Sequence, residues 1–193
     1  MPRCHALLAL MLIQASRLPA RQDEAGDLVL LPDQDRSRWD SRLIHLGLRH
    51  LDLASEGDEL TVYHLQAGIA AVHAMAPDDE STDWPRLLSL YDLLKAVAPS
   101  PIVSLNRAVA LAMVEGPAAG LEAIDEIDAS PELKGYFLLP ATRADLLRKL
   151  GRHSEAEAAY RSAMNSICTD PERRFLAQRL AECGGAVSLI SVT

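Results

Sequence analysis

The chain has 193 residues and a net charge of −8, and 49% of its residues are hydrophobic although only 4% are aromatic. This acidic balance excludes a general attraction to nucleic-acid phosphates, and because no basic run of useful length is present we expect no direct DNA binding. A chain of this length can bury roughly 70% of the surface that it exposes when unfolded, so it needs no disulfide bonds or metal ions to be stable. The three cysteines, Cys4, Cys168 and Cys183, show no metal-ligand spacing, so we expect reduced thiols in the cytoplasm.

The N-terminal segment predicts an amphipathic core helix over residues 5–17. Leu7, Leu10, Met11 and Gln14 recur at the spacing of one helical face. The apolar run after Arg3 also resembles a weak signal peptide, but the helical period continues beyond it and favours the core helix. The run is too short to span a bilayer, and we expect no membrane association.

The first half of the chain predicts three further helices. Residues 21–27 read as a loop, and residues 28–31 as a short extended segment. A helix over 37–54 begins with a capping box of Ser37 and Asp40. Two more helices are predicted over 59–75 and 84–97, the second capped by Asp83.

In the second half, three dipeptides place a capping side chain before a proline. Ser100-Pro101, Ser130-Pro131 and Asp170-Pro171 predict helices over 101–114, 131–150 and 171–183. Residues 117–127 and 153–167 supply the returning helices. Residues 184–193 have no helical period and read as a flexible tail.

Residues 144–163 have the pattern of a tetratricopeptide-type hairpin. Gly151 fits a left-handed position between two short helices, and Ala156, Ala159, Tyr160 and Ala163 provide small contacts and one large filler. Gly116 precedes Gly151 by about one 34-residue period, although Asp125 stands where Tyr160 would align. We therefore predict an all-α fold, a right-handed array of antiparallel helical hairpins. It would form one helical-repeat domain over 1–183, with a divergent half (1–98) and a hairpin half (99–183).

The chain lacks the sequence patterns of common catalytic sites. It has no nucleophile elbow, phosphate-binding glycine loop or zinc helix, and its six histidines share no metal spacing. Asp33, Asp35 and Ser37 resemble a calcium loop only superficially, because Arg38 and Ile44 occupy its required glycine and glutamate positions. We expect no catalytic residue, cofactor or metal, and no enzymatic activity.

Residues 33–40, DQDRSRWD, form the densest polar cluster, and two interpretations remain open. In the structural one, these residues start a helix, with local Asp–Arg pairs and a core anchor at Trp39. In the functional one, Arg36 and Arg38 grip a partner carboxylate beside Trp39. The candidate partner-binding residues are therefore Asp33, Asp35, Arg36, Arg38, Trp39, Asn106, Arg107 and Arg143. The last three are polar residues within apolar helices, where they either line a concave surface or join helices to one another.

Several stretches together resemble one family, and the most specific are DQDRSRWD and PSPIVSLNRAVA; others are GDLVLLPDQDRSRWD, LQAGIAAVHAMAP, TDWPRLLSLYDLL and RADLLRKLGRHSEAEAAYRSAM. They resemble the long C-terminal extension of bacterial extracytoplasmic-function (ECF) sigma factors that carry a tetratricopeptide-like tail. The similarity spans roughly residues 5–183. It implies an all-helical regulatory extension that contacts the upstream sigma domains or core RNA polymerase in transcription initiation. The promoter-binding domains of such factors have no counterpart here, so the chain looks like the extension alone.

Two other functions remain as alternatives. A free-standing helical-repeat adaptor would bind a peptide of an unrelated protein. An enzyme would need a site assembled from scattered polar residues such as Asp33, Asp35, Arg36, His64 and Asn106.

Overall fold

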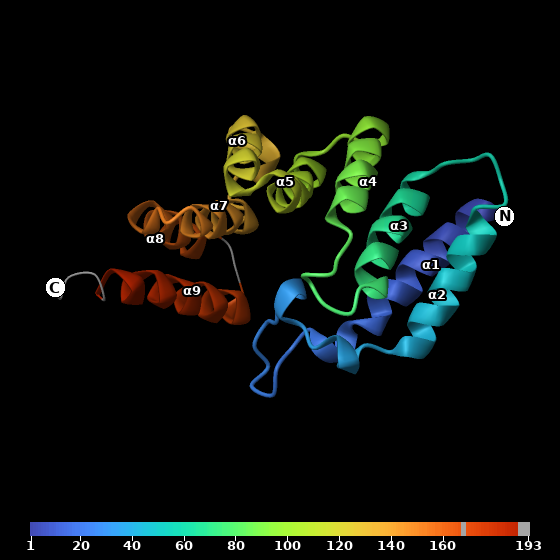
Figure 1. The fold of residues 1–193 in the computed structure, drawn as a ribbon, viewed down its shortest axis with the longest axis horizontal. Coiled ribbons are helices and arrows are strands. Elements are labelled where there is room, and N and C mark those ends of the chain that lie inside the picture. Colours follow the sequence, from blue (N-terminus) through green and yellow to red (C-terminus); the bar gives the residue numbers. More distant parts are fainter. Residues whose placement is uncertain (167–168, 189–193) are drawn as a thin grey trace. The chain divides into compact units, whose positions relative to one another are not determined.

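The computed structural model describes residues 1–166 and 169–188. They form two compact units, which we call unit 1 (residues 1–99) and unit 2 (the described residues from 100 onward) (Figure 1). Within the described residues there are nine α-helices and no strand, with one isolated β-bridge between Gln22 and Leu28. The all-α prediction is confirmed. The boundary between the units, after residue 99, lies one residue from the predicted boundary between the two halves, after residue 98. That the two halves form a single domain stays a prediction.

Unit 1 contains helices α1 (Pro2–Ser16), α2 (Ser41–Ala54), α3 (Val62–Met75) and α4 (Trp84–Val97). Helix α1 packs against α2 and α3, and α3 packs against α4 (Figure 1). Ile13, Ala70 and Ala71 form the buried centre of this packing. Gly47 lets α2 approach α1 closely, because a Cβ there would lie 2.6 Å from Ile13 Cγ1.

The start of α2 differs from its prediction. Asp40 caps the helix, accepting hydrogen bonds from the backbone N–H groups of Arg42 and Leu43. Ser37 instead lies in a 3-10 turn, Arg36–Arg38, whose own cap is Asp35. The backbone N–H of Asp40 donates to Ser16 O at 2.9 Å, which ties this residue to the end of α1 and fixes the helix start there.

Helices α3 and α4 start at side-chain caps, whereas α1 begins at Pro2 without one. Helix α3 begins at Val62, later than predicted, because Thr61 and His64 form a capping box. Helix α4 has its predicted bounds, and Asp83 accepts a hydrogen bond from Arg86 N as expected. The unit contains both tryptophans of the chain, Trp39 and Trp84.

Unit 2 contains helices α5 (Pro101–Glu115), α6 (Pro117–Ile127), α7 (Leu138–Lys149), α8 (His153–Met164) and α9 (Asp170–Ser188). Helix α5 packs against α6, α7 against α8, and α8 against α9. Ala144, Ala156 and Ala163 are fully buried in this core, and Tyr160 is 2% exposed. The predicted helix pairs of this half are therefore present.

Two glycines shape these pairs. Gly151 has a φ of +73°, which confirms the predicted left-handed turn between α7 and α8. Gly120 lies where α6 touches α5, and a Cβ there would lie 2.5 Å from Ala112 Cβ and 2.9 Å from Ala108 O. Helices α5 and α6 are therefore so close at Gly120 that any larger residue would push them apart.

Two predicted helix starts in unit 2 are wrong. Pro131 begins only a short 3-10 turn, Pro131–Leu133, and α7 starts at Leu138. Gly135 lies between them with a φ of +80°, which a continuous right-handed helix does not contain. The cap before α9 is Thr169 rather than Asp170, because Thr169 and Glu172 exchange hydrogen bonds as a capping box.

The end of α9 also differs from its prediction. The helix continues past the predicted end at Cys183 to Ser188. The rest of the predicted tail, residues 189–193, lies outside the described residues, as does Cys168. Cys4 is an exposed free thiol and Cys183 a buried one.

Candidate partner-binding site

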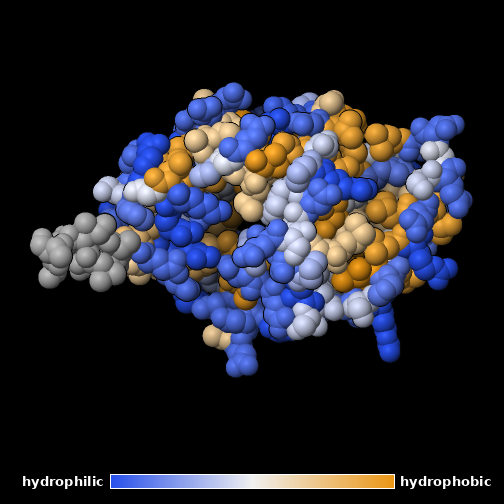
Figure 2. All heavy atoms as spheres, viewed as in Figure 1, coloured by the Kyte–Doolittle hydropathy of each residue, from blue (hydrophilic) through white to orange (hydrophobic). Residues whose placement is uncertain are grey.

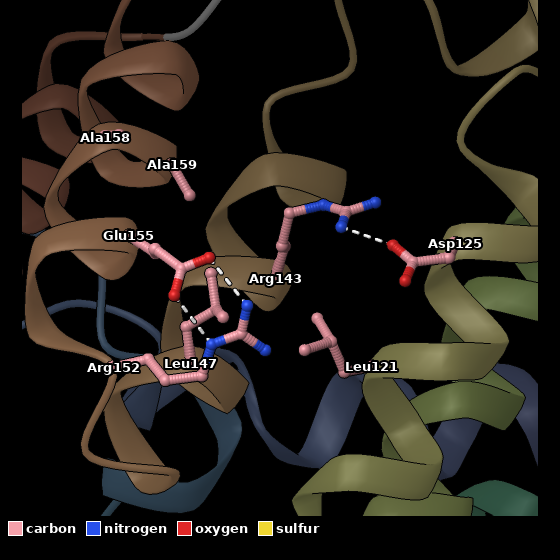
Figure 3. Close-up of a pocket in the computed structure, with 8 residues that line it drawn as sticks. All are labelled: Leu121, Asp125, Arg143, Leu147, Arg152, Glu155, Ala158 and Ala159. Atoms are coloured by element: carbon pink, nitrogen blue, oxygen red, sulfur yellow. Dashed lines mark hydrogen bonds and ion pairs between the residues drawn. The ribbon is translucent and has the colours of Figure 1, made fainter.

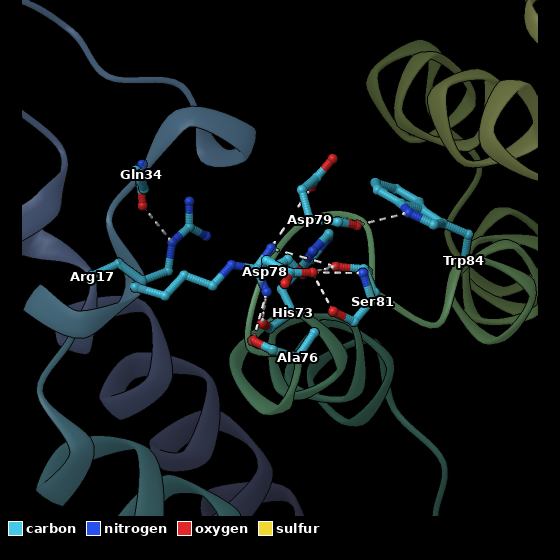
Figure 4. A network of polar contacts seen from close by, with 10 residues as sticks. Arg17, Gln34, His73, Ala76, Asp78, Asp79, Ser81 and Trp84 are labelled. Carbon is cyan, nitrogen blue, oxygen red and sulfur yellow. Dashed lines mark hydrogen bonds and ion pairs between the residues drawn. The ribbon is translucent and has the colours of Figure 1, made fainter.

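Arg36, the central residue of the DQDRSRWD cluster, binds the end of α3 within its own unit. Its Nη1 donates hydrogen bonds to His73 O at 2.9 Å and Ala76 O at 2.7 Å. Its Nη2 lies 3.4 Å from Thr82 Oγ1 and 3.7 Å from Asp79 Oδ1 (Figure 4). The Arg36 side chain is only 9% exposed. The guanidinium therefore acts as a cap on the last carbonyls of α3.

Trp39 is the anchor of this cluster and is 6% exposed. The guanidinium carbons of Arg36 and Arg17 lie 5.2 Å and 5.3 Å from its ring centroid, within the range of cation–π attraction. Its Nε1 is buried and has no hydrogen-bond partner among the described residues. These contacts agree with the structural interpretation for Arg36 and Trp39.

The three other candidate residues of the cluster, Asp33, Asp35 and Arg38, are exposed. Asp35 accepts hydrogen bonds from Ser37 Oγ at 2.7 Å and Ser37 N at 2.9 Å, and these bonds lower the pKa of its carboxyl group. A contact between this exposed edge and a partner stays a prediction.

The buried side of the cluster contains two groups that sequence reasoning missed, Arg17 and His73. Burial lowers the pKa of Arg17 to about 10, and the charges of Arg21 and Arg36 add to the effect. Burial likewise lowers the pKa of His73 to about 4, with smaller contributions from Arg17 and Arg36. His73 is therefore neutral at pH 7, and its ring packs edge-on against Trp84 at 5.7 Å between centroids.

Unit 2 contains a groove with a volume of about 390 Å³ (Figure 3). Helices α6, α7 and α8 form it, and we call it the α6–α8 groove. Its lining residues are Leu121, Asp125, Arg143, Leu147, Arg152, Glu155, Ala158 and Ala159. Leucine and alanine side chains supply its apolar lining, and its charged residues come from all three helical segments.

The charged side chains of the groove are paired with one another. Arg143 pairs with Asp125 and lies 3.4 Å from Asp128. Arg152 donates two hydrogen bonds to Glu155, at 2.7 Å and 2.6 Å (Figure 3). These pairs are partly or fully exposed, so water screens them and each contributes little to stability. Each of these side chains can therefore leave its present partner and pair with a charged group of a ligand at a small cost in free energy.

The structure places the three remaining candidates differently. Arg143 lines the groove, whereas Asn106, exposed on α5, and Arg107, partly exposed on α5, do not. Asp125, which marks the degenerate position of the earlier repeat, is the ion-pair partner of Arg143. No signal within one segment could have identified a groove formed by three helices.

Among the described residues, no group of three or more His, Cys, Asp or Glu side chains could hold a metal ion. His64, a candidate in the enzyme alternative, belongs to the capping box of α3. None of the described helices combines the length and the hydropathy needed to cross a bilayer.

Apolar side chains gather over the part of unit 1 that holds α1, α2 and α3, at the right of Figure 2, with Leu7, Leu8 and Met11 exposed on α1.

Comparisons with known proteins give similarity without a described activity. Residues 1–55 match a family of unknown function, DUF6596. The chain is 40% identical over 179 residues to "Uncharacterized protein R00370" of Rhizobium meliloti (strain 1021). That match covers 93% of this chain but only 42% of the relative, so the chain spans less than half of the relative's length. No solved structure matches the chain.

Proposed function

We propose that this chain is a protein-interaction module that regulates an ECF-type RNA polymerase sigma factor by contacting the sigma domains or the core polymerase. It carries out no reaction of its own. The interaction role rests on one observation, the α6–α8 groove with its apolar lining and exchangeable ion pairs. The assignment to sigma factors rests on the resemblance of DQDRSRWD and PSPIVSLNRAVA to the extensions of such factors.

The groove has the chemistry of a peptide site. Leu121 and Leu147 are buried at 8% and 5% exposure, and the exposed Ala158 leaves room above them for a side chain of a partner. Arg143 and Glu155 can bond to opposite ends of a peptide group or to charged side chains. A stacked array of helix pairs typically offers such a surface for binding peptides. We therefore also propose that the helices of unit 2 have a tetratricopeptide-like arrangement.

The Rhizobium relative supports a larger context for the module. More than half of that protein lies outside the match. We propose that the unmatched part contains the sigma domains on which the module acts. The acidic net charge agrees with a role in contacting protein while leaving promoter DNA to other domains.

Capture assays with two purified partners test this proposal. The partners are core RNA polymerase and the unmatched part of the Rhizobium relative, each offered to the full chain. We expect saturable binding to at least one, and no binding to promoter DNA. Absence of binding to both partners would contradict the sigma-factor assignment and favour the free-standing adaptor.

A pair of variants tests the groove itself. Ala158→Trp fills the groove from an exposed position and should weaken binding by at least about tenfold. Ala96→Trp makes the same exchange at an exposed alanine of α4, which does not line the groove, and should bind as the wild type does. Equal binding by both variants would exclude the groove as the contact.

A further inference from the structure

We propose that Arg17 is a receptor for a carboxylate side chain of the partner protein. The inference rests on the proposed function, since it names the chemistry by which unit 1 recognises that partner. It concerns a residue outside DQDRSRWD and outside the α6–α8 groove, and it follows from the incomplete hydrogen bonding of one partly buried cation.

Arg17 lacks the counterion that a partly buried arginine ordinarily has. Within the described residues its one hydrogen bond runs from Nε to the neutral amide oxygen of Gln34, at a long 3.4 Å. Its two terminal nitrogens donate to no group in the described part of the chain. The nearby Asp79 lies against Arg36 instead, at 3.7 Å. A guanidinium has five N–H donors, so most of its capacity is unused here.

The guanidinium is nevertheless held in place. Arg17 lies at the C-cap of α1, and its guanidinium carbon is 5.3 Å from the ring centroid of the buried Trp39. Gln34, which accepts from Nε, is itself 7% exposed and donates to Val29 O at 3.0 Å. Figure 4 shows Arg17 and Gln34 facing each other. A fork fixed in this way loses little side-chain entropy when a ligand binds.

The surroundings favour an anion. Arg21 and Arg36 add positive charge beside Arg17, and they contribute to its lowered pKa. Trp39 Nε1 is a further unpaired donor in the same cluster. A carboxylate matches the guanidinium fork with two parallel hydrogen bonds. The sequence has no basic run that could contact successive phosphates of a nucleic acid, so an acidic side chain of a protein is the occupant that we assign.

Nuclear magnetic resonance of the full chain provides the test. The probe is a blocked hexaglutamate peptide, with hexaglutamine and inorganic phosphate as comparison ligands. The readouts are the Nε–H signal of Arg17 and the indole N–H signal of Trp39. We expect both signals to shift saturably with hexaglutamate, weakly with phosphate and not with hexaglutamine.

Three variants assign the binding to Arg17. Arg17→Gln should raise the Kd for hexaglutamate by at least about tenfold, while Arg42→Gln removes a charge from an exposed site on α2 and should leave the Kd within about twofold. Circular dichroism checks that each variant is folded. If Arg17→Gln is unfolded, Arg17→Lys decides, because it keeps the charge but loses the fork and should raise the Kd severalfold.

The inference is overturned if Arg17→Gln binds as well as the wild type, or if no ligand shifts the two signals at millimolar concentration. Tighter binding of phosphate than of hexaglutamate would also overturn it, in favour of a free anion. Failure here with intact capture of polymerase or of the relative would remove the role of Arg17 alone. Intact hexaglutamate binding with failed capture would instead remove the sigma-factor assignment.

Discussion

Replacing Gly120 with alanine should destabilise unit 2, although the same exchange inside a helix ordinarily adds stability. Alanine in a helix interior is favoured over glycine by up to about 1 kcal/mol. At Gly120 the new Cβ would lie 2.5 Å from Ala112 Cβ and 2.9 Å from the backbone oxygen of Ala108. Neither neighbour is a flexible side-chain end, so α6 must move away from α5.

Overpacking of this kind costs about 1–3 kcal/mol. Because two rigid atoms are involved, we expect a cost near the upper limit and a net loss of about 1–2 kcal/mol after the gain in helix propensity. Urea denaturation followed by circular dichroism measures this change.

Gly68→Ala provides the matched control. A Cβ at Gly68 in α3 would meet only the two δ carbons of Leu90, both at 3.6 Å, which is ordinary contact. This variant should gain about 0.5–1 kcal/mol. A Gly120→Ala protein as stable as the wild type would refute the close approach of α5 and α6.

Three further predictions concern turns, caps and pH. Gly151→Val should cost more than about 1 kcal/mol, because its φ of +73° disfavours a side chain, whereas Gly151→Asn should cost less; an unchanged thermal midpoint for the valine variant would contradict the turn. Arg36→Ala should cost about 2–3 kcal/mol in a denaturant titration, since it leaves the carbonyls of His73 and Ala76 without their charged donor; near-normal stability would instead support the contact-surface interpretation. The pKa of His73 falls from 6.5 to about 4 on folding, so below pH 6.5 the unfolded chain takes up a proton that the folded chain does not. Its contribution to stability is therefore complete above pH 6.5 and is lost as the pH falls toward 4, by about 2.5 kcal/mol at pH 4.5; His73→Gln should flatten this part of the pH profile, and an unchanged profile would contradict the burial of this imidazole.

Local capping signals predicted the starts of α4 and α5 correctly, but Ser130-Pro131 begins only a 3-10 turn. Asp83 and Ser100 cap α4 and α5 as expected, each accepting a hydrogen bond from a backbone N–H in the first turn. At two other helices the structure uses a different cap from the predicted one. Ser37 gave way to Asp40 because a backbone bond to Ser16 fixed the later start, and Asp170 gave way to Thr169 because Glu172 completes a box with it.

The candidate site was harder to predict, because its contacts join distant residues. The bonds from Arg36 reach His73 and Ala76 on another helix, and no local pattern distinguishes such an arginine from an exposed one. Arg143 was found because it is a charged residue in an apolar helix, but its partner Asp125 comes from α6. No sequence pattern marks Arg17 as a binding residue. The proposal for it depends on the missing carboxylate partner, which only the structure reveals.

The position of both indoles in unit 1 gives the chain a built-in optical label. Intrinsic emission excited at the tryptophan band reports the melting of residues 1–99 alone, while far-ultraviolet ellipticity follows every helix. Comparing the two traces during one titration therefore separates the unfolding of the N-terminal helices from that of the remainder, with no dye or added chromophore.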